Sequence, residues 1–154
     1  IGSPLGGEVS GHLFYGDNYF GFDDAPLVAL KTLEIISKSG KTISELFEEI
    51  PKLFATPEVI MTAPDDRKFK IVDALTEAMK AKTEVITIDG VRAQWEGGWG
   101  LVRASNTQPA ITMRFESYTK AQMVEMMKVF HDELAKYPEV DLSKLEQQIE
   151  RFGE

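Results

Sequence analysis

The sequence predicts an α+β fold, in which an incomplete α/β piece is followed by a domain with a four-stranded antiparallel sheet and helices on one face. Four short runs rich in β-branched and aromatic residues, at 84–89, 91–96, 99–105 and 110–117, predict the sheet. Apolar residues at helical spacing flank these runs on both sides. Residues 1–56 differ, because a glycine-rich and aromatic stretch precedes two helical patterns there.

The first segment, residues 1–56, has the pattern of the closing part of an α/β unit. It opens with Ile1 and reaches a glycine-rich loop with no visible element before that loop. A loop of this kind normally has a strand on each side, so we expect the sequence to be a piece of a longer chain. Residues 13–15 predict a short buried strand, and residues 16–18 predict a turn.

Two helices are expected later in this segment. Asp23 or Asp24 is suited to cap the first helix at its N-terminus, and Gly40 is suited to end it. Thr42 or Ser44 begins a second, shorter helix.

A strand at 58–62 opens the second segment, residues 57–138. Asp65 or Asp66 is then expected to cap a helix that continues to about Lys82. The apolar residues at intervals of three and four, which this helix would bury, are Phe69, Val72, Leu75 and Met79.

The sheet and the last helices complete the expected fold. Asp89-Gly90, between the first two β-rich runs, is a strong hairpin signal. A helix over 119–137 follows the fourth run, and residues 139–154 form a third segment, a helical tail. The residues expected on the buried side of the 119–137 helix are Met123, Met126, Met127, Phe130 and Leu134.

Composition limits the classes of function. The 154 residues carry a formal net charge of −8, which argues against sequence-independent binding to nucleic acid or to an anionic membrane surface. Because cysteine is absent, disulfides and cysteine-based metal or redox sites are excluded. Neither an apolar run of the roughly 20 residues that span a bilayer nor a signal peptide is visible, and we expect a cytoplasmic protein.

The stretch RASNTQP at 103–109 combines Arg103 with Ser105, Asn106 and Thr107. Such a loop can offer hydroxyls, an amide and backbone N–H groups to an anion, while the guanidinium supplies charge and bidentate geometry. A polar hairpin turn is the alternative interpretation, and it explains the small polar residues but not the arginine. The loop is therefore a candidate phosphate site.

The stretch GGEVSGH at 6–12 places Glu8, Ser10 and His12 between glycines. Glu8 and Ser10 are two residues apart, so on an extended loop they would face the same side. A carboxylate and a hydroxyl there would suit the vicinal hydroxyls of a sugar, with His12 as a third donor. The alternatives are a tight glycine turn with exposed side chains and, for His12, an imidazole packed beside the aromatic run.

Other clusters suit structural roles better. Asp17, Asp23 and Asp24 lack the regular spacing of a calcium loop and fit turns and caps. Trp95 and Trp99 could stack on a sugar, but packing across strands is the commoner use of such a pair.

The two loops together resemble those of a known family. GGEVSGH is similar to the sugar-binding loop in the third domain of the α-D-phosphohexomutases. DGVRAQWEGGWGLVRASNTQPAITMRFES is similar to the phosphate-binding stretch of their fourth domain. The resemblance covers residues 6–137 and favours the phosphomannomutase/phosphoglucomutase type. It implies a fourth domain with the fold of the TATA-box-binding protein, a likeness that says nothing about DNA.

The resemblance also implies a function. In the family, a phosphoserine of the first domain exchanges phosphoryl groups with a hexose 1- or 6-phosphate through a hexose 1,6-bisphosphate, assisted by Mg²⁺ held by aspartates of the second domain. By resemblance, Glu8 and Ser10, with His12 beside them, hold the sugar, and Arg103, Ser105, Asn106 and Thr107 hold the phosphate that is not transferred.

Neither the phosphoserine loop nor the Asp-rich Mg²⁺ loop occurs in these residues. The catalytic residues and the metal ligands are therefore expected in N-terminal domains of the same enzyme, and the 154-residue chain alone is expected to be inactive. A free-standing, non-catalytic phosphosugar-binding module is the alternative.

Overall fold

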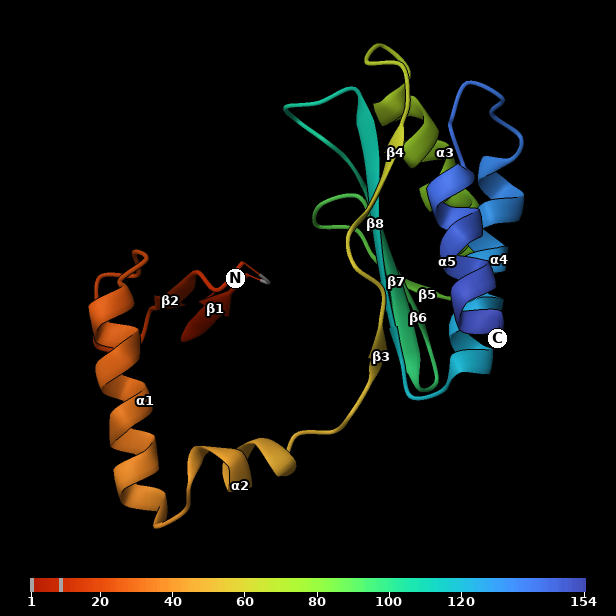
Figure 1. Cartoon of the computed structure of the whole chain (residues 1–154). Coiled ribbons are helices and arrows are strands. Elements are labelled where there is room, and N and C mark those ends of the chain that lie inside the picture. The colour runs from red at the N-terminus through yellow and green to blue at the C-terminus, as the bar shows by residue number, and fades with distance from the viewer. Residues whose placement is uncertain (1, 9) are drawn as a thin grey trace. The chain divides into compact units, whose positions relative to one another are not determined.

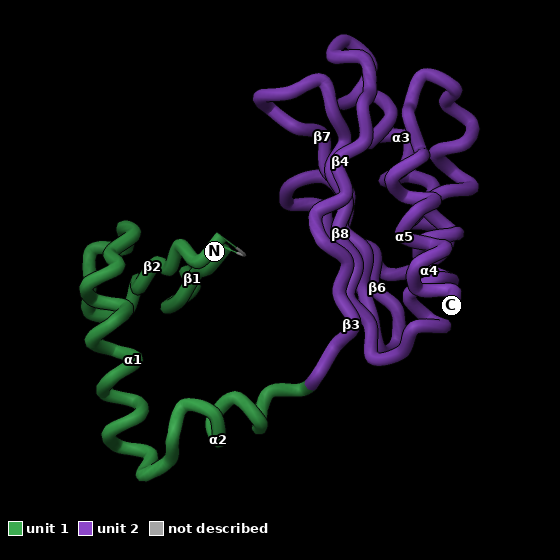
Figure 2. Tube along the Cα trace, in the orientation of Figure 1, with its two compact units in different colours: residues 1–51 green, residues 52–154 purple. Residues whose placement is uncertain are grey.

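The computed structural model describes residues 2–8 and 10–154, so Ile1 and Val9 lie outside the described residues. The chain forms two compact units, residues 1–51 and residues 52–154 (Figure 2).

The first unit begins with a small hairpin. Strand β1 (Leu5–Gly7) pairs antiparallel with β2 (Leu13–Tyr15), and the glycine-rich loop joins them. The expectation that no element precedes this loop is therefore wrong, because three residues that include two glycines are too short and too weakly apolar to show a strand pattern. The strand at 13–15 is confirmed, although it is half-buried and not buried.

Helix α1 (Ala25–Ser39) follows the hairpin. Asp24 is its N-cap, since its side chain accepts a hydrogen bond of 3.0 Å from the backbone N–H of Leu27. Gly40 ends the helix in the left-handed conformation, at φ 66°. The expected helix is thus confirmed, and of the two candidate caps the structure uses Asp24 and not Asp23.

Helix α2 (Ile43–Glu48) completes the unit. Thr42 caps it through a capping box, in which the Thr42 hydroxyl and the Glu45 side chain each accept a hydrogen bond from the other residue's backbone N–H. Large apolar side chains of both helices face solvent, and Leu30 (66% exposed) and Phe47 (71% exposed) are examples.

The second unit is built on one antiparallel sheet with the strand order β3-β8-β7-β6-β5, in which β4 also pairs with β8. The four β-rich runs are confirmed as β5 to β8, and the strand expected at 58–62 is confirmed as β4. Strands β3 and β4 extend the sheet along β8. The strands are β3 (Phe54–Ala55), β4 (Val59–Thr62), β5 (Glu84–Ile86), β6 (Val91–Trp95), β7 (Gly98–Ala104) and β8 (Ala110–Ser117).

Three helices, α3 (Lys68–Lys80), α4 (Lys120–Leu134) and α5 (Ser143–Gly153), lie on one face of this sheet (Figure 1). Helix α4 buries all the methionines, the phenylalanine and the leucine that its periodicity predicts. The expected tail helix is confirmed as α5, which packs on α4 and β4. Within the described part of the chain, every helix is too short or too polar to cross a membrane.

The start of α3 differs from the expected one. The helix begins at Lys68 with Arg67 as its N-cap, so the expectation of a cap at Asp65 or Asp66 is wrong. Phe69 was expected in the core but is 50% exposed, and Lys68 is buried in its place. The other expected core residues of this helix are confirmed, namely Val72, Leu75 and Met79.

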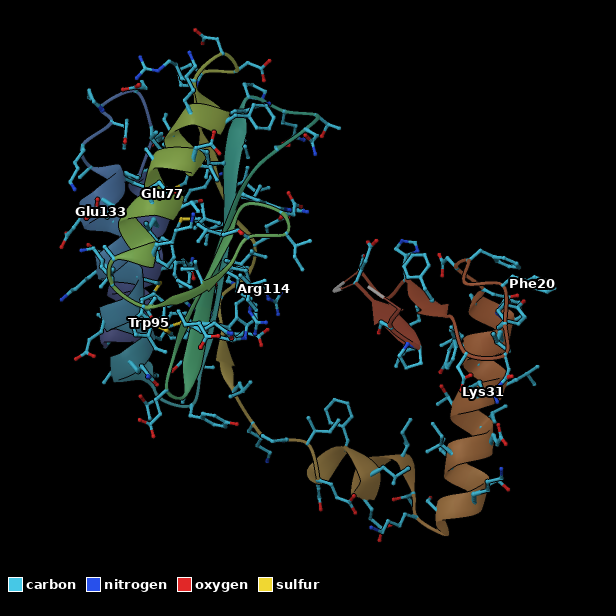
Figure 3. All side chains as sticks on the ribbon, turned by 180° about the vertical axis from the view of Figure 1, so that it is seen from behind. Phe20, Lys31, Glu77, Trp95, Arg114 and Glu133 are labelled. Carbon is cyan, nitrogen blue, oxygen red and sulfur yellow. The ribbon has the colours of Figure 1, made fainter. Side chains whose placement is uncertain are left out.

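The opposite face of the sheet is open. Arg103 lies opposite Thr112, and two residues earlier Leu101 lies opposite Arg114, so by the alternation of strand side chains all four share one face. Figure 3 shows Arg114 on the open side and Trp95 on the side that the helices cover. Arg103 therefore extends from the open face, at the end of β7.

Candidate functional site

A hollow of about 320 Å³ opens at the loop that joins β7 to β8. Its lining includes every residue predicted for phosphate binding, namely Arg103, Ser105, Asn106 and Thr107. Gln108 and Thr112 line it as well, and Glu58 and Asp89 add carboxylates. Strand β4, the β5–β6 turn and the β7–β8 loop thus converge on one small polar hollow.

Arg103 supplies the positive charge of the hollow. Its Nε donates a hydrogen bond of 3.3 Å to the Thr112 hydroxyl. Its two terminal nitrogens lie 3.4 Å from Asp89 Oδ2 and 3.7 Å from Glu58 Oε1. The side chain is 49% exposed, and ion pairs this long and this exposed contribute at most about 1 kcal/mol each. An anion in the hollow can therefore replace the carboxylates as partner of the guanidinium.

Gly90 fixes the turn that carries Asp89. Its φ is 69°, and a Cβ atom added to it would lie 2.1 Å from the carbonyl oxygen of Val102 and 2.8 Å from the Cα of Arg103. The turn therefore packs directly against the backbone from which the Arg103 side chain extends. A glycine is required here for both reasons, the backbone conformation and the close approach.

Ser105 organises the loop itself. Its backbone N–H donates to the carbonyl of Ala110 at 2.9 Å. Its hydroxyl oxygen accepts from the backbone N–H groups of Thr107, at 3.4 Å, and Gln108, at 3.2 Å. These two successive N–H groups therefore point to the same side of the turn, where the Ser105 hydroxyl is their acceptor. Asn106 and Thr107 are exposed at its tip.

Sequence reasoning missed Lys68, which contacts this loop from α3. Its Nζ lies 2.5 Å from Asp65 Oδ1 and donates a hydrogen bond of 2.8 Å to the carbonyl of Gln108. The side chain is 3% exposed. The signal that could have revealed it is its position four residues before Val72, in the stripe of α3 that faces the core.

The predicted sugar residues lie in the turn between β1 and β2. The Glu8 N–H donates to the carbonyl of His12 at 2.9 Å, and the Gly11 N–H donates to the carbonyl of Glu8 at 3.0 Å. The Ser10 hydroxyl donates to Glu8 Oε2 at 3.1 Å, so these two side chains meet as expected. The side chains of Glu8, Ser10 and His12 are all exposed, which excludes a packed His12.

His12 is paired with Asp23. Its Nδ1 lies 2.5 Å from Asp23 Oδ2, and a backbone bridge between Phe14 and Asp23 holds the two segments together. The hydrogen bond to Asp23 and the charge of this carboxylate raise the pKa of His12, and the charge of Glu8 adds to the effect. Asp23, expected in a turn or a cap, thus favours a protonated imidazole whose Nε2 remains a donor.

The pairing gives a testable titration. Replacing Asp23 with asparagine is expected to lower the pKa of His12 toward its ordinary value of 6.5, as measured by the pH dependence of the imidazole resonances in NMR. Because the folded pKa is raised, the pair stabilises the fold fully below about pH 6.5, and this contribution is lost as the pH rises through the raised pKa. Asp17→Asn in the neighbouring turn is the matched control, and an equal pKa in both variants would contradict the pairing.

The tryptophans have separate structural roles. The Trp95 ring packs edge-on against Phe130 at 6.0 Å between centroids, on the helix side. The guanidinium of Arg92 lies 4.5 Å from the centre of the Trp99 ring. Because Trp95 pairs with Gly98, the neighbour of Trp99, the two rings point to opposite faces. They form neither a cross-strand pair nor a joint platform for a sugar.

Two family descriptions match the chain. "Phosphoglucomutase/phosphomannomutase, alpha/beta/alpha domain III" matches residues 2–54. "Phosphoglucomutase/phosphomannomutase, C-terminal domain" matches residues 58–133. The first match contains the glycine-rich hairpin loop, and the second contains the polar hollow.

Curated relatives and a solved structure agree. The chain is 44% identical over 143 residues to a phosphomannomutase/phosphoglucomutase of Pseudomonas syringae pv. tomato, across 92% of this chain and 31% of that protein. It is 39% identical over 134 residues to a phosphoglucomutase of Neisseria meningitidis serogroup A, across 84% and 28%. A phosphoglucomutase/phosphomannomutase family protein from Burkholderia thailandensis matches with a TM-score of 0.72 and 33% identity, across 91% of this chain and 30% of that one.

The chain thus spans about a third of the length of the relatives that it matches. The two matched descriptions occur in the order in which the sequence resemblance placed the loops, and they leave only a few residues between them. On these matches, the chain belongs to the phosphoglucomutase/phosphomannomutase family, and its residues correspond to domain III and the C-terminal domain.

Proposed function

We propose that this chain is the substrate-recognition part of a phosphohexomutase, which interconverts hexose 1-phosphate and hexose 6-phosphate through a phosphoserine and a bisphosphate intermediate. The observation that carries the proposal is the hollow in which Arg103 and the loop of residues 105–108 converge. The loosely held guanidinium suits a phosphate dianion. In this proposal the N–H groups of Thr107 and Gln108 exchange the Ser105 hydroxyl for phosphate oxygens. The names of the relatives support the same class of reaction.

The hairpin loop is proposed to hold the sugar. The Glu8 carboxylate accepts hydrogen bonds from sugar hydroxyls, and Ser10, already 3.1 Å from that carboxylate, adds a donor and acceptor. The pairing with Asp23 raises the pKa of His12 and so favours the protonated imidazole, which donates from Nε2. In this proposal the hairpin loop recognises sugar hydroxyls, and the β7–β8 loop recognises phosphate.

Phosphoryl transfer is proposed to depend on groups beyond these residues. A phosphoserine would carry the phosphoryl group, a hexose 1,6-bisphosphate would act as activator and intermediate, and Mg²⁺ would neutralise charge on the transferring group. Among residues 2–8 and 10–154, no three His, Asp or Glu side chains are grouped so that they could hold a metal ion. The residues of this chain would bind, orient and enclose the substrate, in a cytoplasmic isomerase of carbohydrate metabolism.

Binding tests the proposal directly. In a ¹⁵N NMR titration, inorganic phosphate is expected to shift the amide signals of residues 103–108, and a hexose 1-phosphate those of residues 8–12 as well. The neutral hexose at the same concentration is the control and should leave residues 103–108 unmoved. If phosphate and hexose 1-phosphate both leave residues 103–108 unmoved, the proposed site is wrong.

Turnover is a separate expectation. With Mg²⁺ and a hexose 1,6-bisphosphate, the 154-residue chain is expected to convert no hexose 1-phosphate to hexose 6-phosphate in a coupled dehydrogenase assay. Conversion above the rate without protein would contradict the assignment of catalysis to other residues.

A free-standing phosphosugar-binding module predicts the same binding. The gene's reading frame separates the two functions, because an upstream serine loop and an Asp-rich loop favour the mutase and a start codon near Ile1 favours the module.

A further inference from the structure

Lys68 is a cation buried behind the candidate phosphate loop. Its side chain is 3% exposed although it stands at the first position of a helix, where a lysine ordinarily reaches solvent. Removing an ammonium group from water costs several kcal/mol unless its hydrogen bonds are replaced. The structure replaces them with Asp65 Oδ1, at 2.5 Å, and the carbonyl oxygen of Gln108, at 2.8 Å.

The Gln108 carbonyl is the point at which the loop is held. It accepts the Lys68 hydrogen bond across 40 positions of sequence and a second one, of 2.8 Å, from the backbone N–H of Ala110. The next residue, Pro109, has no N–H, and its carbonyl accepts from Ala63 at 3.0 Å. The C-terminal half of the loop is therefore held by contacts to α3 and to the end of β4, and the contact to α3 is a hydrogen bond from a charged group.

This contact bears on the anion-binding groups of the loop. The Gln108 N–H is one of the two that converge on the Ser105 hydroxyl, and its own carbonyl is the atom that Lys68 holds. With that carbonyl fixed toward α3, Gln108 loses rotations that would turn its N–H away from the Ser105 hydroxyl and so change the shape of the loop. A loop that is already ordered before the ligand binds loses less conformational entropy on binding, so the affinity is higher.

We propose that Lys68 is a positioning residue for phosphate, which acts through the Gln108 carbonyl to keep the loop of residues 105–108 in its binding conformation. The inference rests on the proposed function of that loop. Asp65, the other partner of Lys68, is 75% exposed, and among the described residues its carboxylate makes no hydrogen bond to the loop of residues 105–108. It therefore provides a control that removes the ion pair and keeps the loop contact.

The experiment measures the affinity of the 154-residue chain for inorganic phosphate and for a hexose 1-phosphate by NMR, together with its unfolding in urea. Lys68→Met is expected to weaken phosphate binding about tenfold, which corresponds to about 1.4 kcal/mol. Lys68→Arg, which keeps charge and donors, should restore most of the affinity. Asp65→Asn should lower stability without weakening phosphate binding, because the loop contact remains.

The outcomes are distinguishable. If the unchanged chain binds no phosphate, the proposed function fails; if it binds phosphate and folded Lys68→Met binds it equally well, only the role of Lys68 fails. Lys68→Leu, which also removes the donor to the Gln108 carbonyl, replaces Lys68→Met should the latter not fold, and wild-type affinity there also overturns the proposal. In the unchanged chain, the Lys68 ammonium resonance should shift with the same dissociation constant as the amides of residues 105–108, and a static resonance counts against it.

Discussion

Replacing Arg103 with alanine is expected to weaken the binding of a hexose 1-phosphate by about 10- to 100-fold, which corresponds to the loss of a charged hydrogen bond of about 1.5–3 kcal/mol. The substitution also leaves Glu58 and Asp89 at the hollow without the guanidinium between them. Their negative charges would then repel a phosphate dianion. Titration by NMR or calorimetry measures the change in dissociation constant.

Arg92→Ala is the matched control for this prediction. Arg92 is also on the sheet of the second unit, but its guanidinium lies over the Trp99 ring and outside the lining of the hollow. The control changes the net charge by the same amount, so it corrects for the overall field of an acidic protein. Equal losses of affinity in the two variants would show that Arg103 acts only through net charge.

Replacing Gly90 with alanine is expected to destabilise the second unit by about 2–5 kcal/mol. An alanine at φ 69° costs about 1–2 kcal/mol, and overpacking against Val102 and Arg103 adds about 1–3 kcal/mol. Both tryptophans of the chain lie in the second unit, so their fluorescence during urea unfolding reports on that unit alone. The variant should also bind phosphate more weakly, because the clash moves the backbone that carries Arg103.

Gly97→Ala separates the cost of the backbone conformation from the cost of overpacking. Gly97 also has a positive φ, of 84°, in a turn of the same sheet, but the nearest atom to an added Cβ is the end of the flexible Gln122 side chain. Its expected cost is the conformational term alone, about 1–2 kcal/mol, with phosphate affinity unchanged. A Gly90 variant that is no less stable than the Gly97 variant would contradict the close packing beneath Arg103.

Local sequence signals predicted much of the fold because the interactions that determine those elements are themselves local. The Asp24 cap and the Gly40 terminus need only their own helix, and Thr42 with Glu45 forms its capping box within four residues. Burial alternates along much of β6 and β7, and the turns at their ends carry Asp89-Gly90 and Gly97. The residues predicted at 103–107 do line one polar hollow, and their role in holding phosphate stays a prediction.

The missed features depend on contacts between distant residues. A stripe through Phe69 and Val72 fits helical periodicity as well as one through Lys68 and Val72, and only the packing of the core decides between them. The burial of Lys68 depends on a carbonyl 40 residues away, at Gln108. In the same way, the pairing of His12 with Asp23 depends on how the chain folds back after the hairpin.

The alternation of side chains along β7 constrains how this stretch of the gene can change in length. Arg103 reaches the hollow because it lies an even number of residues from Leu101, on the open face. Inserting or deleting one codon within Gly98–Ala104 would turn the arginine toward the helices and bring an apolar neighbour out to solvent. Length variation among homologues is therefore expected in the turns that flank β7 and not within the strand.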